Sequence, residues 1–138
     1  MQALSSVLEL ALAQMSPAPS FSRDQDGGED IPAAGLVVLR DGLPGEPEVL
    51  LSPLTYLYEH RAEVDVMVSG PPAERHARFD QLCRAIGAAV EADRTLGDLC
   101  DWVEPQAPEP VAVAVEGGED IRAATLGLVL SYATASPL

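Results

Sequence analysis

The sequence predicts an α+β domain in which a mainly antiparallel sheet has two helices packed on one face. Apolar and polar residues alternate along 55–68 and again along 121–134, as they do on half-buried strands. Apolar residues also recur at helical spacing in 2–15 and 72–93. Each of these elements has one apolar stripe, and two layers are the simplest arrangement that buries all of them.

The segment 55–68, TYLYEHRAEVDVMV, is the most informative part of the chain. Its even positions are mostly apolar, and its odd positions carry the charged residues Glu59, Arg61, Glu63 and Asp65. Successive side chains of a strand point to opposite faces, so the pattern predicts one strand with a buried face and a charged face. The segment is much longer than the usual strand of about five or six residues. We therefore expect part of it to extend past the sheet and contact another subunit.

The helix at 2–15 should end before the first proline. The residues that follow, 16–34, are rich in Pro, Ser, Asp and Gly, so we expect a mobile acidic loop that contains at most a short strand near Phe21. Ser69 or Gly70 should cap the second helix. One face of that helix carries the apolar residues Phe79, Leu82, Cys83, Ile86, Ala89 and Val90.

Further strands complete the predicted sheet. Short strands at 36–40 and 48–51 should form a hairpin, and flanking prolines, which lack an N–H for the ladder, should keep the second strand short or at an edge. A short strand is also expected at 100–103. The strand at 121–134 should pair with the long strand in the middle of the sheet. The segment 111–115 fits either an edge strand or an arm that orders on docking.

Length and charge limit the function. The 138 residues predict a single domain, 1–138, with one core. Asp and Glu number 22 against 8 basic residues, all of them arginine, which gives a formal net charge of −14. Nucleic-acid affinity depends on clustered Lys and Arg, and anionic membranes repel an acidic chain, so we expect neither specific nucleic-acid binding nor membrane association. The N-terminus lacks the features of a signal peptide or a membrane span, so the chain should stay in the cytoplasm.

Candidates for catalysis are few. The sequence has no motif typical of a nucleophile elbow, a phosphate-binding loop or a zinc protease. His60 should be a partly buried, hydrogen-bonded imidazole, and His76 should lie on the surface. Cys83 and Cys100 stand in apolar runs, where a small thiol is expected to pack in the core. The sequence therefore predicts no catalytic residue and no cofactor.

Metal binding has a weak basis. Glu29 with Asp30 and Glu119 with Asp120 offer hard oxygen ligands for Ca²⁺ or Mg²⁺. Their spacing matches no EF-hand, and adjacent carboxylates in glycine-rich turns are usually solvated, so we expect no metal site. Trp102 fits either the edge of the core or an assembly interface.

Three motifs carry a resemblance to a known family. They are Y-x-Y-E-H-R-A-E-V-x-V at 56–66, F-D-x-L-x-x-A-I-G-A-A-V-E-A-D-R-T-L-G-D-L at 79–99 and G-x-x-D-I-x-A-A-T-L-x-L-x-L-x-Y-x-T at 117–134. Together with an N-terminal amphipathic helix and a hairpin, they resemble the tail terminator proteins of long-tailed phages and related prophages, the family of the lambda minor tail protein U. The resemblance spans roughly Leu36 to Thr134.

The resemblance implies a structural role without catalysis. Such proteins form a six-membered ring on the growing end of the tail tube, stop its polymerisation and present a surface for joining the head. The partners would be further copies of the chain, a tail tube protein and a head-tail connector protein, in the virion tail and, during assembly, in the host cytoplasm. An acidic ring would also repel the phosphates of passing DNA. We expect part of the subunit interface at Glu59, Arg61, Glu63, Asp65 and Trp102.

Two alternatives stay open from the residues alone. One is a small enzyme that handles acyl-CoA, with Asp65, His60 or Cys83 in a pocket. The other is an acidic adaptor or chaperone-like module that remains a monomer or dimer. A closed ring would favour the tail terminator, whereas a deep apolar pocket with a perturbed carboxylate at its floor would favour the enzyme.

Overall fold

The fold is described by a computed structural model over residues 2–23, 34–110 and 121–135. Within these residues the chain forms two helices and a seven-stranded mixed sheet that is mostly antiparallel, which confirms the predicted α+β class. The elements in chain order are α1 (Gln2–Ala13), β1 (Ser20–Arg23), β2 (Leu36–Leu43), β3 (Glu48–Leu51), β4 (Leu54–Ser69), α2 (Pro72–Ala92), β5 (Trp102–Pro105), β6 (Glu109–Pro110) and β7 (Ile121–Thr134).

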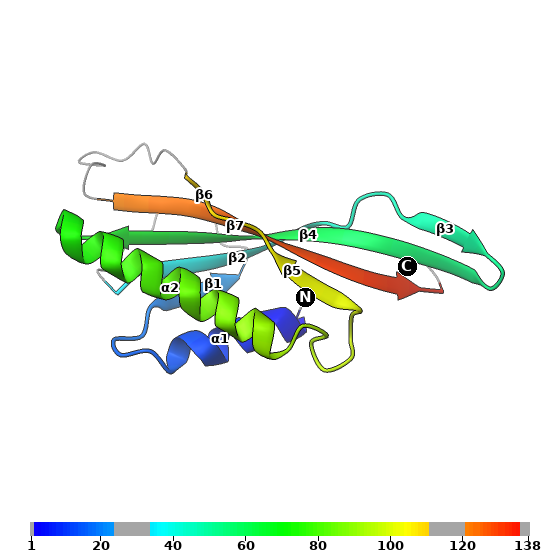
Figure 1. The fold of residues 1–138 in the computed structure, drawn as a ribbon, viewed down its shortest axis with the longest axis horizontal. Coiled ribbons are helices and arrows are strands. Elements are labelled where there is room, and N and C mark those ends of the chain that lie inside the picture. Colours follow the sequence, from blue (N-terminus) through cyan, green and yellow to red (C-terminus); the bar gives the residue numbers. More distant parts are fainter. Residues whose placement is uncertain (1, 24–33, 111–120, 136–138) are drawn as a thin grey trace.

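Two long strands form the centre of the sheet (Figure 1). β4 and β7 are antiparallel and stay in register from the pair Tyr56 and Thr134 to the pair Ser69 and Ile121, as predicted. The order across the sheet is β1-β2-β4-β7-β5, with β1 parallel to β2. β3 pairs with the first residues of β4, and β6 pairs with β7.

The predicted hairpin between 36–40 and 48–51 is wrong. β2 continues to Leu43 and pairs with β4, and β3 also pairs with β4. Only residues 52 and 53 separate β3 from β4, and such a short connection favours pairing of the two strands that it joins. The connection from β2 to β3 instead contains two prolines, Pro44 and Pro47, which offer no N–H to a ladder.

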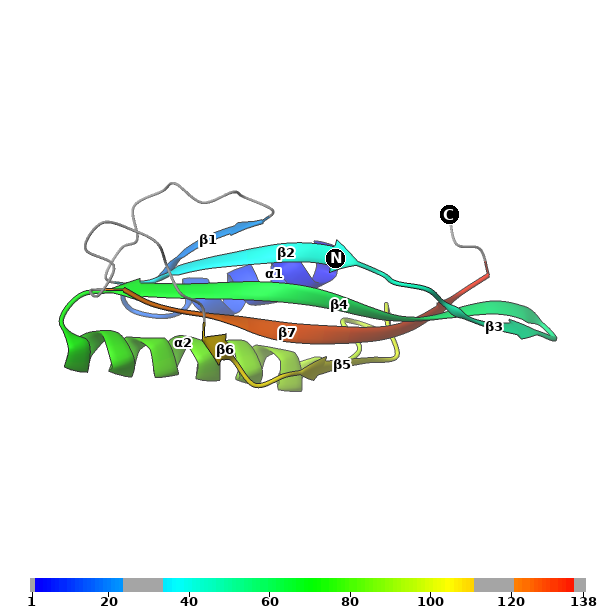
Figure 2. The same cartoon turned by 90° about the horizontal axis from the view of Figure 1, so that it is seen from above.

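Both helices pack on one face of the sheet (Figure 2). The even positions of β4 from 58 to 68 are buried on that face, as the alternation predicts. α1 contributes Leu4, Leu8 and Leu12 to the core, and α2 contributes Phe79, Leu82, Ile86 and Val90. Cys83 and Ala89, which were expected on the same face of α2, are only partly buried.

Several predicted boundaries shift. α1 ends at Ala13, two residues before the predicted end. The expected cap at Ser69 or Gly70 is wrong, because Pro71 occupies the cap position of α2 and no side chain caps that end. Pro72 follows at the start of the helix and has no N–H that would need a partner. The strand expected at 100–103 forms at Trp102–Pro105.

Some predictions concern residues outside the described ranges. They include most of the acidic loop, 24–33, and the segment 111–115. The short strand predicted near Phe21 is confirmed as β1. In the part of the chain that the structure describes, no helix is both long and apolar enough to span a membrane.

Candidate functional site

The sheet face away from the helices carries a connected set of charged side chains. The odd positions of β4 place Arg61, Glu63 and Asp65 on this open face, and Arg40 joins them from β2. Arg61 Nη1 lies 2.6 Å from Glu63 Oε1, and Arg40 Nη2 lies 2.7 Å from Glu63 Oε2. Arg40 Nε also lies 3.0 Å from Asp65 Oδ2. Two arginines and two carboxylates therefore neutralise one another within the subunit.

A residue just after β5 and a residue of β7 hold the two ends of this network. Arg61 Nε donates to Gln106 Oε1 at 3.1 Å, and Thr125 Oγ1 on β7 donates to Asp65 Oδ1 at 2.7 Å. Gly127 lies opposite Glu63 in the ladder. A Cβ at Gly127 would overlap Gln106 Oε1 and come within 2.9 Å of Arg61 Nε. Only glycine therefore leaves room for the Arg61 guanidinium to lie across β7.

The residues expected at the interface do not form one patch. Arg61, Glu63 and Asp65 are joined in the network, whereas Glu59 is exposed and makes no ion pair within the described part of the chain. Trp102 lies on the edge strand β5 with 47% of its surface exposed. Its Nε1 donates to Glu104 Oε2 at 2.7 Å, and its ring lies 4.6 Å from the Arg94 guanidinium.

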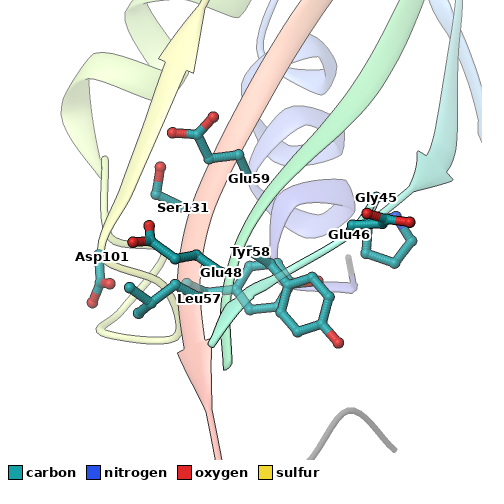
Figure 3. Close-up of a pocket in the computed structure, with 10 residues that line it drawn as sticks. Gly45, Glu46, Glu48, Leu57, Tyr58, Glu59, Asp101 and Ser131 are labelled. Atoms are coloured by element: carbon teal, nitrogen blue, oxygen red, sulfur yellow. The ribbon is translucent and has the colours of Figure 1, made fainter. Parts of the chain in front are cut away.

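Glu59 lies beside a concavity of about 560 Å³ at the base of β3 (Figure 3). The concavity extends from the connection between β2 and β3 across β4 and β7 to Asp101. Its carboxylates are Glu46, Glu48, Glu59 and Asp101, and no arginine lines it. This end of the sheet is therefore strongly negative.

His60 lies on the helix-covered face and is buried, where the sequence predicted a partly buried, hydrogen-bonded ring. Its Nε2 is hydrogen-bonded to the carbonyl oxygen of Asp41, which can only accept, so Nε2 carries the proton. In the neutral ring, Nδ1 then accepts from the Tyr132 hydroxyl at 3.3 Å. Both nitrogens are engaged in structural hydrogen bonds. His76 is exposed on α2, also as predicted.

A second concavity, of about 390 Å³, adjoins His60 on the helix-covered face. Its lining is mostly apolar and consists of Gln2, Ala3, His60, Leu96, Leu99, Cys100, Leu130 and Tyr132. Asp65 lies on the opposite face of the sheet, and Cys83 is not part of the lining. The three residues considered for acyl-CoA chemistry therefore do not share a pocket.

Both cysteines are free and partly buried, and they pack against the core. Burial, with a smaller contribution from Asp80, raises the pKa of Cys83 to about 11. Burial also raises the pKa of Cys100. A thiol with a raised pKa is mostly protonated near neutral pH and is a poor nucleophile.

Asp41 on β2 forms an ion pair with Arg23 on the edge strand β1. Arg23 Nε donates to Asp41 Oδ1 at 2.8 Å, and a second guanidinium nitrogen contacts the other carboxylate oxygen. The hydrogen bond from Arg23 lowers the pKa of Asp41, against a smaller opposing effect of burial. Arg23 also reaches Gln2 of α1, so this pair links the helix layer to the edge of the sheet.

The sequence predicted that part of the strand 55–68 extends past the sheet, but it did not indicate the projecting ribbon that the start of this strand forms with β3. This ribbon is here called the arm: residues 48–57, comprising β3 and its partner residues in β4. It extends beyond the helix layer (Figures 1 and 2). Its exposed apolar side chains are Val49, Leu50, Leu51 and Leu54. Leu51 is 82% exposed, and Leu43 at the end of β2 is 83% exposed. The signal was the run VLLSPL, which is too apolar for an ordinary surface loop.

Comparison of the sequence with protein-family models and with curated proteins gave no match. Among the residues that the structure describes, no group of three or more His, Cys, Asp or Glu side chains could hold a metal ion. The carboxylates considered for metal binding, Glu29, Asp30, Glu119 and Asp120, lie outside those residues.

Proposed function

We propose that this protein is a virion assembly protein that caps the phage tail tube as a ring, ends its polymerisation and provides the surface for head joining. The observation that carries the proposal is the arm. Its leucines are exposed, and the arm itself extends past the helices at the end of an elongated sheet (Figure 2). The arm is thus the part of the subunit best suited to contact another protein.

The energetics of the arm support an assembly role. An isolated two-stranded ribbon is marginally stable in water, and the tip of the arm, around Leu51 and Leu54, is paired only within the ribbon. Burial of apolar surface contributes about 25 cal/mol per Å². A neighbouring subunit that covers the leucines would therefore gain binding energy and stabilise the ribbon at once. Alternation along β3 and its register with β4 put Val49, Leu51 and Leu54 on one face of the ribbon, and exposed apolar residues gathered on one face typically mark a protein interface.

The resemblance and the charge support the same function. Two of the motifs that resemble tail terminators include residues of β4 and of β7, the paired centre of the sheet, and the third includes α2 from Phe79 onward. The net charge of −14 suits a ring through which DNA passes without binding, because an acidic wall repels phosphates. The acyl-CoA alternative has no comparable support, since Asp65 and His60 lie on opposite faces of the sheet.

The test is the length of the tails. Phage particles made without this protein should carry tails of widely varying, often excessive length that lack heads, because nothing stops tube growth. Supplying the protein in trans should restore a single length. Electron microscopy of purified particles measures both outcomes. Tails of normal length with heads attached, in the absence of the protein, would refute the proposal.

A further inference from the structure

We draw no further inference here: the strongest candidate, the exposed apolar face that Val49, Leu51 and Leu54 form on the arm, carries nothing beyond the proposed function because nothing in the structure shows what covers it.

Discussion

The two ends of strand β4 differ in what covers them. Toward its C-terminal end, Ala62, Val64, Val66 and Val68 are fully buried beneath the helices. At its start, Leu54 is 49% exposed, although it is as apolar as the buried residues. The difference lies in where the helix layer stops, as Figure 2 shows. Apolar residues of one strand therefore serve two purposes: those under the helices stabilise the fold, and those of the arm remain available for a partner.

The largest effect should come from the helix-covered end. Phe79 on α2 is 2% exposed, and the Arg122 guanidinium lies 4.3 Å from its ring. Phe79→Ala removes a buried ring and leaves a cavity, so we expect a loss of about 3–5 kcal/mol in the free energy of unfolding. Urea denaturation followed by circular dichroism measures it. A loss below about 1 kcal/mol would mean that the helices do not form the stabilising layer.

The next effect concerns Gly42, in the bulged end of β2. Its φ is +67°, and a Cβ there would overlap the backbone carbonyl oxygen of Arg61. Neither the strained φ nor a clash with backbone can relax cheaply, so Gly42→Ala should destabilise by roughly 2–3 kcal/mol.

Gly127→Ala is the matched control for Gly42→Ala. The atoms that its Cβ would meet belong to the side chains of Gln106 and Arg61, which can rotate away. Gly127→Ala should lower the free energy of unfolding by less than about 1 kcal/mol, which is the usual contribution of an exposed ion pair. Thermal denaturation of both variants measures the difference in stability. An equal loss of stability in the two would contradict this account of the bulge.

A smaller effect on stability, which depends on pH, is expected at Asp41, near the end of β2. Arg23 lowers the pKa of Asp41 below its ordinary value of 3.8 in the folded chain. A lowered folded-state pKa contributes stability that is present above pH 3.8 and is lost as the pH falls through 3.8 toward the folded-state value. Asp41→Asn should therefore be less stable than wild type near neutral pH, and the difference should shrink in acid. Urea midpoints between pH 6 and pH 2.5 test this, and a difference independent of pH would exclude the titration of Asp41 as its cause.

Alternation and helical spacing predicted the parts of the fold that depend on local pattern. The buried face of β4, the apolar face of α2 and the central pairing of β4 with β7 could all be derived in this way. The pairing of β2 with β4 could not be derived in this way. It follows when β2 and β3 do not pair with each other, and the prolines between them offer no N–H for such pairing.

The candidate site was only partly predictable for the same reason. The alternation placed Arg61, Glu63 and Asp65 on one face, but it could not show that Arg40, distant in the sequence, already neutralises two of them. A projection of the long strand was expected, but the exposed apolar residues of the arm were not, because apolar alternation alone does not reveal where the helix layer ends. The ion pairs of Arg40 and the exposure of the arm both depend on how segments distant in the sequence are arranged, and residue type alone does not reveal that arrangement.

The smallest effect on stability should come from a substitution in the arm. This prediction tests the difference between the two ends of β4 most directly. Leu51 is 82% exposed, so Leu51→Ala removes few contacts within the subunit and should change the free energy of unfolding by less than about 0.5 kcal/mol. If the chain assembles as proposed, the same variant should weaken self-association, because the lost contacts would lie between subunits. Urea denaturation at low protein concentration and sedimentation at high concentration separate the two effects. A large loss of stability in the dilute monomer would show that Leu51 belongs to the core of its own chain, and the distinction between the two ends of β4 would fail.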